Sequence, residues 1–430
     1  MYKFVIEGDH PLSGSVSLLG GKNNFIPTIC ATLLTDKPCI IENIPKILDV
    51  RVLFKILRIL GSDIKYLSPT KIQITNKNLS LDKDKERIIF ENIKKMRGSV
   101  LLIAPLIHRF KNISFVYPGG DKIGGRDLSV HFSGFRKLGL NIDFKDSTFD
   151  ITGDLEANYI FLYEPSVTAT ENLLMLCSVI DGESIIENAA CEPHVKDLCI
   201  MLTKMGVLIE GIGTNILKIK GNLNLSGVEL KISSDSIEAA TYVVFALMSK
   251  GNIKIDNIDT SVMKSIFYVF DMFNMNYSLS ENSIEIFKDQ DLFYKKELGF
   301  SNLGIYTQPY PAFPTDLLPL VIPLSTQVRG EMIFFEKMFE NRLDFAVELK
   351  KMGAELTMLD THRILVKGAV NLRHANIASR DIRSGVAYLS AMLAAQGISV
   401  LTEIENIDRA YPDIEKILTR LNGNIKRLKI

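Results

Sequence analysis

Residues 117 to 131 read YPGGDKIGGRDLSVH and combine four glycines with Asp121 and Arg126 in one short stretch. Glycine-rich loops often bind phosphates, because bare backbone N–H groups can approach an anion closely. This stretch fits neither the P-loop nor the dinucleotide fingerprint, since it lacks the lysine and hydroxyl pair of the first and the spaced acid of the second. Taken alone, it is equally well a flexible surface turn with a solvated arginine.

Further polar residues stand where apolar helices are expected to begin. Lys22 and Asn23, in GGKNN, precede FIPTICATLL, and Arg97 precedes SVLLIAPLI. Asp316 follows two stiffening prolines in PAFPTD, and Arg409 lies in NIDRAY at another junction of loop and helix. Each residue alone is more simply a helix cap or a surface charge. Together with the arginine of the glycine-rich stretch, the cations predict a basic cleft for a phosphate or a carboxylate.

The overall composition narrows the class of protein. Lysine and arginine number 50, against 50 aspartates and glutamates, so charge provides no reason to expect nucleic acid or an anionic membrane as a partner. The longest apolar run, residues 100 to 107, is far too short to span a bilayer, and no secretory signal precedes it. We therefore expect a soluble, cytoplasmic protein.

The five cysteines are irregularly spaced and odd in number, which suits a reducing compartment better than a disulfide framework. Cys191, His194 and Cys199 are close enough in sequence to be considered as metal ligands. No second Cys/His pair stands nearby, and Cys199 lies in an apolar, helix-like run. We predict no metal site.

A helix-like segment that ends in an apolar residue and then Gly or Asn, followed by a short strand, recurs along the chain. The six copies are LGSDIKY, LGLNIDF, MGVLIEG, FNMNYSL, MGAELTM and LNGNIKRL, with marker residues near positions 61, 139, 206, 274, 353 and 422. Glycine at such a helix end is a C-cap signal, because it enters the left-handed conformation without steric cost. A turn and a second strand often follow. The alternative is that such pairs are simply common at helix ends.

The spacing of the copies favours two α/β domains of three units each over an open solenoid. Residues 1–21 form two short strands that cannot pack alone, and we expect them to complete the last unit. This predicts a first domain at 22–230, which carries the glycine-rich loop, and a second domain made of 1–21 and 231–430. The predicted active site lies in the cleft between them.

A series of segments spread over the whole chain resembles the enolpyruvyl transferase family: GGKNN, IIENIPKILDV, KKMRGSVLLIAPLI, PGGDKIGGR, IIENAACEP, PYPAFPTD, FENR, SRDIRS and NIDRAY. The resemblance implies a two-domain inside-out α/β barrel of six βαβαββ-type units, three per domain. It implies transfer of the enolpyruvyl group of phosphoenolpyruvate to the 3′-hydroxyl of UDP-N-acetylglucosamine, with release of phosphate, at the first committed step of peptidoglycan synthesis. No metal or redox cofactor is implied. We expect a monomer.

The resemblance also assigns roles to residues. The implied catalytic residues are Asp121, Lys22, Asp316 and Arg409. The implied phosphoenolpyruvate-binding residues are Lys22, Asn23, Arg97, Arg126 and Arg409. The implied UDP-sugar-binding residues are Asn23, Arg97, Arg126, Leu128, Val130, His131, Ser166, Val167, Asp316 and Met338. In this assignment Asp316 accepts a hydrogen bond from the attacking hydroxyl, and the glycines let the loop of Asp121 close as a lid.

The chain departs from the family pattern at several of these places. Most members carry cysteine where this chain has Asp121, so we predict insensitivity to fosfomycin, which alkylates that cysteine. Four further changes lie on the nucleotide side, at Asp127, Ser129, Glu164 and Cys191. They leave open a different nucleotide or shikimate 3-phosphate as the acceptor. A non-catalytic binding protein of the same fold is a further alternative.

Overall fold

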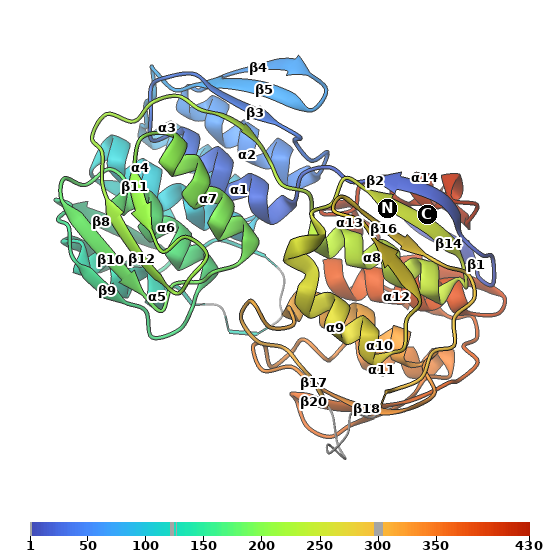
Figure 1. Cartoon of the computed structure of the whole chain (residues 1–430). Coiled ribbons are helices and arrows are strands. Elements are labelled where there is room, and N and C mark those ends of the chain that lie inside the picture. Colours follow the sequence, from blue (N-terminus) through green and yellow to red (C-terminus); the bar gives the residue numbers. More distant parts are fainter. Residues whose placement is uncertain (1, 121–123, 126, 296–303) are drawn as a thin grey trace. The chain divides into compact units, whose positions relative to one another are not determined.

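The computed structural model describes residues 2–120, 124–125, 127–295 and 304–430 (Figure 1). These residues form two compact units. Unit 1 takes the described residues of 2–18, 124–125 and 234–430, and unit 2 takes those of 19–120 and 127–233. Each unit has its own hydrophobic core and three small sheets.

Unit 2 combines mixed sheets with seven α-helices among its described residues. Its sheets have the orders β13(Glu229–Lys231)-β3(Cys39–Glu42)-β5(Lys71–Thr75)-β4(Asp63–Ser68), β11(Leu208–Glu210)-β12(Ile216–Lys220)-β10(Glu183–Glu187)-β9(Tyr159–Phe161) and β6(Ile113–Val116)-β8(Thr148–Gly153)-β7(Leu140–Phe144). Its helices are α1(Lys22–Thr32), α2(Leu48–Leu60), α3(Lys83–Ile93), the 3₁₀ turn η1(Arg97–Leu102), α4(Ile103–Phe110), α5(Ser129–Lys137), α6(Val167–Cys177) and α7(Pro193–Lys204).

Unit 1 is built from the same kinds of element. Its sheets have the orders β21(Asn376–Ala378)-β22(Ile398–Thr402)-β1(Tyr2–Glu7)-β23(Asn424–Lys429), β15(Tyr277–Leu279)-β16(Ser283–Ile286)-β14(Asn252–Asp256)-β2(Ser13–Ser17) and β17(Gly304–Tyr306)-β18(Gly330–Phe335)-β20(Arg363–Gly368)-β19(Glu355–Met358). Its helices are α8(Ser236–Met248), η2(Thr260–Met263), α9(Lys264–Met272), η3(Thr315–Leu317), α10(Leu318–Ser325), α11(Ala346–Leu349), η4(Lys350–Met352), α12(Ile382–Ala394), α13(Glu405–Asp408) and α14(Ile414–Arg420).

The repeated helix-end signal is confirmed by the backbone. All six marker residues have a positive φ, from +56° to +110°: Gly61, Gly139, Gly206, Asn274, Gly353 and Asn422. Five of them lead into antiparallel hairpins, namely β4–β5, β7–β8, β11–β12, β15–β16 and β19–β20. At the sixth, β23 pairs with β1, so the N-terminal strand takes the place of the missing second strand.

The two N-terminal strands therefore belong to different sheets. The expectation that they complete the last copy is right for β1, which lies between β22 and β23. It is wrong for β2, which pairs in parallel with β14 from Ser13↔Asn252 to Ser17↔Asp256. The GDHPL segment between the two strands, residues 8–12, leads the chain from one sheet to the next.

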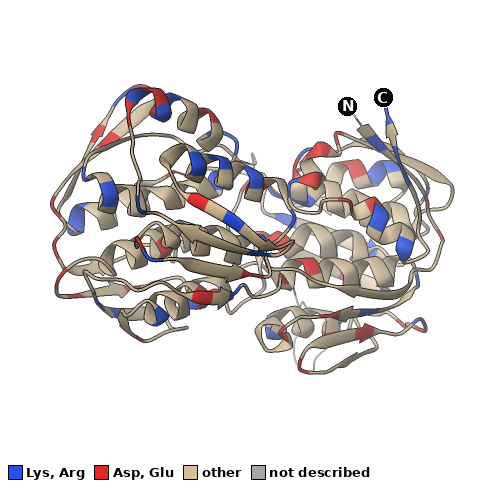
Figure 2. Ribbon diagram, turned by 90° about the horizontal axis from the view of Figure 1, so that it is seen from above, with Lys and Arg blue, Asp and Glu red and all other residues tan. Residues whose placement is uncertain are grey.

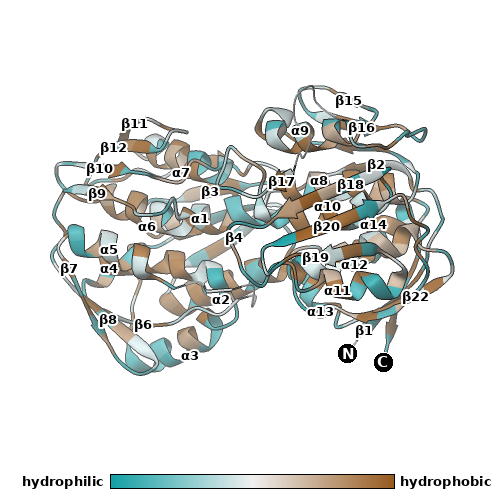
Figure 3. Cartoon of the chain, turned by 90° about the horizontal axis from the view of Figure 1, so that it is seen from below, coloured by the Kyte–Doolittle hydropathy of each residue, from teal (hydrophilic) through white to brown (hydrophobic). Residues whose placement is uncertain are grey.

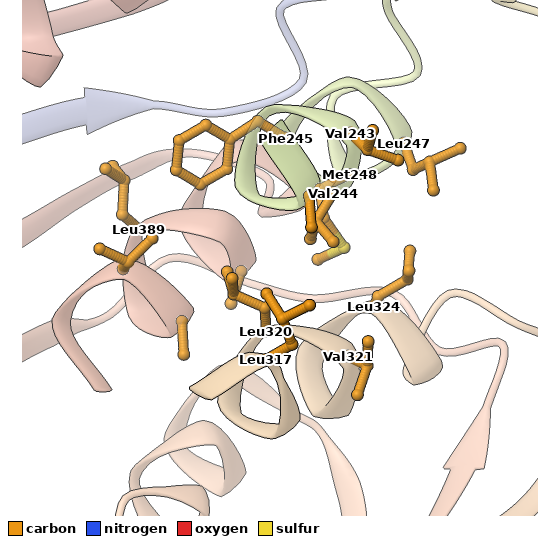
Figure 4. Packing of buried hydrophobic residues seen from close by; sticks show 14 of the residues in the cluster. Val243, Val244, Phe245, Leu247, Met248, Leu317, Leu320, Val321, Leu324 and Leu389 are labelled. Atoms are coloured by element: carbon orange, nitrogen blue, oxygen red, sulfur yellow. The ribbon is translucent and has the colours of Figure 1, made fainter. Parts of the chain in front are cut away.

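Each unit keeps its most apolar helices inside its sheets. In unit 1 all eight residues of α10 and eleven of the thirteen in α12 are buried, and α8 is nearly as enclosed. Figure 4 shows side chains of α8, α10 and α12 packed against one another, and Figure 3 shows the brown colour of hydrophobic residues on α10. Inward residues of all three sheets, such as Phe4, Ile253 and Phe334, join the same core. A helix that is apolar all round must be buried in this way.

Unit 2 follows the same plan with α1 and α6, each with nine of eleven residues buried. Charged side chains of both signs are interspersed on the outer elements of each unit (Figure 2). Within the described ranges, no helix is long and apolar enough to cross a membrane. Because the inner helices are covered along their sides, their ends are where polar side chains can be presented.

Candidate active site

Lys22 is the first residue of α1, at the end of a helix whose body is almost entirely buried. Its Nζ lies 3.4 Å from Oδ2 of Asp49, whose side chain is only 3% exposed, whereas 21% of the Lys22 side chain remains exposed. Asn23 follows, half-buried, and the Nδ2 of Asn24 donates to Asp197 on α7 at 2.7 Å. A cation and free helix N–H groups therefore stand together, an arrangement that attracts an anion.

Arg97 begins η1 and is oriented by the chain after the glycine-rich stretch. Its Nη2 donates to the backbone oxygen of Asp127 at 3.2 Å. The Asp127 carboxylate accepts from the hydroxyl and the backbone N–H of Ser129, and these hydrogen bonds lower its pKa. The Ser129 hydroxyl also contacts the Tyr163 hydroxyl. Two of the positions that depart from the family pattern are thus hydrogen-bonded to each other.

Leu128, Val130 and His131 lie at the start of α5 with buried side chains, at most 3% exposed. His131 contacts Thr168 Oγ1 through Nε2 at 3.0 Å and Asn172 Nδ2 through Nδ1 at 3.2 Å. Burial, reinforced by the charge of Arg97, lowers the pKa of His131 to about 3, so the ring is neutral at physiological pH. The His131 side chain therefore ties α5 to α6.

Ser166 and Val167, both half-buried, form the N-terminus of α6, the second inner helix of unit 2. The Ser166 N–H donates to the backbone oxygen of Glu164 at 2.8 Å, and Glu164 itself is exposed. Cys191 is half-buried, and burial raises the pKa of its thiol. No group of three His, Cys, Asp or Glu side chains suited to a metal occurs in the part of the chain that the structure describes.

Asp316 is held between two arginines in unit 1. Arg342 Nη2 donates to its Oδ1 at 2.7 Å and Arg383 Nη2 to its Oδ2 at 2.6 Å. The arginine side chains are 4% and 12% exposed, but that of Asp316 is 28% exposed. Burial alone would lower the pKa of Arg383, but electrostatic interactions with Asp316, Tyr411 and Asp235, together with the hydrogen bond to Asp316, make the net shift upward. The carboxylate is thus fixed in orientation and still reachable.

A buried carboxylate stabilises the turn of Asp316 through hydrogen bonds. Glu336 is fully buried, and its Oε2 accepts from the Thr315 hydroxyl at 2.7 Å. Its Oε1 accepts from the backbone N–H of Met338 at 2.8 Å. Thr315 in turn accepts from Arg342 Nε at 3.3 Å. The turn of Asp316 and the loop of Met338, whose side chain is 39% exposed, are thereby joined.

Arg409 follows α13 directly as its C-cap and is half-buried. The neighbouring Asp408 accepts two hydrogen bonds from Arg427, at 2.5 and 2.8 Å. Two residues after Arg409, the Tyr411 hydroxyl accepts from Arg383 Nη1 at 3.0 Å. The structure therefore connects the turn of Arg409 to Asp316 through one arginine.

Asp121 and Arg126, the polar residues of the glycine-rich stretch, lie outside the described residues. Between them, Gly124 has a φ of +141°, and a Cβ built there would lie 2.4 Å from Glu340 Oε2. The Gly125 N–H donates to Glu340 Oε1 at 2.9 Å, and this bond contributes to a lowered pKa of Glu340.

Several residues of these networks were not singled out from the sequence as site residues. Arg342 and Arg383 stand inside FENR and SRDIRS, so the motifs themselves were a signal. Thr315 and Tyr411 likewise stand inside PYPAFPTD and NIDRAY. Glu336 had no such signal, because a buried polar residue has no distinctive spacing. In chemical terms, unit 2 offers cations at helix N-termini for an anionic substrate. Unit 1 offers an oriented carboxylate that can accept a hydroxyl proton or hydrogen bond.

Comparison with known proteins agrees with this chemistry. The sequence profile of the family described as EPSP synthase (3-phosphoshikimate 1-carboxyvinyltransferase) matches residues 6–418. A UDP-N-acetylglucosamine 1-carboxyvinyltransferase of Borreliella burgdorferi is 38% identical over 431 residues, which cover 100% of both chains. One of Porphyromonas gingivalis is 37% identical over 439 residues, again covering 100% of both.

Solved structures share the fold at lower identity. The enolpyruvyl transferase NikO from Streptomyces tendae has a TM-score of 0.89 at 20% identity, covering 100% of this chain and 99% of that one. An EPSP synthase from Acinetobacter baumannii has a TM-score of 0.72 at 15% identity, covering 100% of both. The mixed α/β architecture with six small sheets is the one that these proteins have.

Proposed function

We propose, because this chain belongs to the carboxyvinyl (enolpyruvyl) transferase family, that it transfers the enolpyruvyl group of phosphoenolpyruvate to the 3′-hydroxyl of UDP-N-acetylglucosamine. Phosphate is the second product, and the reaction opens peptidoglycan synthesis. Relatives named for this activity match from end to end at 35–38% identity, which supports the choice of acceptor. The cytoplasm fits this role, since none of the five cysteines, all within the described residues, forms a disulfide.

The proposal includes the arrangement of the chain. We infer two domains, 22–230 and 1–21 with 231–430, each of three βαβαββ-type units in an inside-out barrel. The six sheets and the antiparallel pairing of β1 with β23 support this arrangement. We also infer that the active site lies in the cleft between these domains. A monomer suffices for such a site.

The observation that carries the mechanism is the fixed, accessible carboxylate of Asp316 between Arg342 and Arg383. Asp316 accepts the hydrogen bond of the acceptor's 3′-hydroxyl as its oxygen attacks C2 of the enol. Asp121 donates a proton to C3 in the same addition. A proton then passes from C3 back to the Asp121 carboxylate as the C2–O bond to phosphate breaks, which forms the enol ether product and releases phosphate. Each half-reaction thus couples one bond change at C2 with a proton transfer at C3.

Cationic side chains bind the anionic groups of phosphoenolpyruvate. Lys22 at the N-terminus of α1 and Arg97 at η1 bind from unit 2, with Arg126, while Arg409 binds from unit 1. Arginine suits this task because its fork can hold a carboxylate or phosphate through two hydrogen bonds. Asn23 completes this group. Preorganised charge of this kind is the main source of transition-state stabilisation in group transfer.

A different acceptor is the second candidate, and one observation favours it. Asp127, Ser129 and Tyr163 form a hydrogen-bonded cluster beside Arg97, and Glu164 is exposed nearby in sequence. Negative charge here would weaken binding of a diphosphate. Another nucleotide or shikimate 3-phosphate would then be the substrate, and a protein without catalysis is the remaining alternative.

The test is phosphate release from phosphoenolpyruvate by the purified protein, with UDP-N-acetylglucosamine, UDP, UMP or shikimate 3-phosphate as acceptor and mass spectrometry of the product. We expect release with the UDP-sugar alone and a product heavier by one enolpyruvyl group. Release with another acceptor would move the assignment to that substrate. No release with any acceptor would favour a binding protein of the same fold.

A further inference from the structure

A buried tyrosine contacts the arginine that holds Asp316. Arg383, the second residue of α12, donates from Nη2 to Asp316 at 2.6 Å and from Nη1 to the Tyr411 hydroxyl at 3.0 Å. Tyr411 is 4% exposed, and its hydroxyl lies 2.9 Å from Thr241 Oγ1 on α8. One guanidinium group therefore divides its donors between an accessible carboxylate and a buried phenol.

The direction of each hydrogen bond follows from counting protons. The Thr241 hydroxyl donates its single proton to the backbone oxygen of Ile237 at 2.8 Å. The Tyr411 hydroxyl must then donate to Thr241, which leaves an oxygen lone pair to accept from Arg383. The result is a chain with a single direction, from Arg383 through Tyr411 and Thr241 to the backbone of α8. A buried chain of this kind stabilises one orientation of its members.

The phenol keeps its proton over the working pH range. Burial raises the pKa of Tyr411 to about 12, although the charge of Arg383 opposes the shift. Tyr411 therefore remains a donor to Thr241 and a neutral acceptor for Arg383 near neutral pH. It supplies geometry and does not supply a proton.

The position of Tyr411 in the chain adds a second connection. It lies two residues after Arg409, and its backbone N–H closes the end of α13 by donating to Ile407 at 2.9 Å. The same residue thus closes the turn that carries Arg409 through its backbone N–H and contacts the guanidinium that orients Asp316 through its hydroxyl.

We propose that Tyr411 is a positioning residue: its hydroxyl fixes Arg383, and through it the Asp316 carboxylate, while its backbone N–H closes the turn of Arg409. The catalytic consequence rests on the proposed enolpyruvyl transfer, in which these two residues contact different substrates. Without the hydroxyl, one Nη1 donor of a nearly buried guanidinium loses its acceptor, and the guanidinium is free to rotate away from Asp316. Displacement of a catalytic group by about 1 Å can cost on the order of a hundredfold in rate.

The perturbation is Tyr411→Phe, which deletes one oxygen, and the matched control is Tyr388→Phe. Tyr388 is fully buried on α12 in the same core, but its hydroxyl donates to the backbone oxygen of Phe345 at 3.1 Å. We expect Tyr411→Phe to lower kcat at least about tenfold and Tyr388→Phe to leave it within about twofold of wild type. Equal effects on kcat would overturn the proposal, because both variants lose a buried phenol.

Two double-mutant cycles distinguish a positioning role of Tyr411 from a general loss of stability. In kcat, Tyr411→Phe combined with Arg383→Lys should be little worse than Arg383→Lys alone, since Tyr411 acts through that arginine; independent, multiplying effects would contradict the proposal. In urea unfolding, the midpoint shift caused by Tyr411→Phe should shrink by at least about half when Asp316 is already Asn. This second cycle needs no activity, so it tests the link between Tyr411 and Asp316 even if wild type releases no phosphate. Strict additivity there would refute the link by itself.

Discussion

Replacing the buried Glu336 with glutamine removes one oxygen acceptor and one charge without a change in size. The Oε1 of Glu336 accepts the backbone N–H groups of Met338 and Phe339, at 2.8 and 3.2 Å, and its Oε2 accepts the Thr315 hydroxyl. Glutamine can keep its oxygen on the two N–H groups. Its NH₂ group then faces Thr315, which already accepts from Arg342. The hydroxyl proton of Thr315 is left without its acceptor.

The expected cost follows from these contacts. A hydrogen bond to a charged acceptor contributes about 1.5–3 kcal/mol, and the two retained bonds weaken when the acceptor becomes neutral. Burying an amide costs less than burying a carboxylate, which offsets part of this loss. We therefore expect the Glu336→Gln variant to lose about 2 kcal/mol of unfolding free energy. The loop of Met338 should loosen as well, and we expect KM for the UDP-sugar to rise about tenfold, which corresponds to about 1.4 kcal/mol.

The assay is urea unfolding followed by a signal assigned to unit 1, since two units need not unfold in one transition. Steady-state kinetics with each substrate varied accompany it. The control is Glu405→Gln, where an exposed glutamate accepts the Tyr2 N–H at 3.0 Å, and we expect a change within about 0.5 kcal/mol. A Glu336→Gln protein as stable as wild type or more stable would show that the desolvation cost outweighs the hydrogen bonds. The supporting role assigned to Glu336 would then be wrong.

Three further predictions concern unit 2 and the glycine-rich stretch. Fosfomycin should leave the intact mass unchanged, whereas the Asp121→Cys variant should gain one adduct; labelling of the wild-type protein would contradict this. Lys22→Ala should lower phosphate release at least about a hundredfold, and release like that of wild type would remove Lys22 from the chemistry. The pKa of His131 falls on folding from about 6.5 to about 3, so the unfolded state binds more protons below pH 6.5 and stability falls with the pH. Unit 2 should lose about 2 kcal/mol between pH 7 and pH 5 from this group. Urea unfolding of His131→Gln should lack that loss, and an unchanged pH dependence would refute the assignment.

The repeated architecture could be predicted because it depends on local rules. A left-handed residue at a helix end and an alternating strand after it are each specified within a few residues, and all six marker positions have the expected positive φ. The pairing of β2 with β14 could not be predicted in this way. Its partner is more than two hundred residues away, and a five-residue strand rich in serine has little pattern to specify one sheet over another.

The same distinction holds for the site: residues marked by a local sequence pattern could be predicted, and residues brought together by packing could not. Lys22 and Arg97 were found because a polar residue before an apolar helix is visible in the sequence, and both do begin helical elements. The residues around Asp316 follow no such rule: 26 residues separate it from Arg342, 67 from Arg383, and 170 separate Tyr411 from Thr241. What brings them together is the packing of α8, α10 and α12, three helices so apolar that their sides can contact only one another and the sheets around them. Charged side chains in such a unit lie near the helix ends, as Asp316 and Arg383 do, whereas Thr241 inside α8 donates to the backbone of its own helix. The apolar composition that makes these helices easy to recognise as core therefore also determines where the chemistry is assembled.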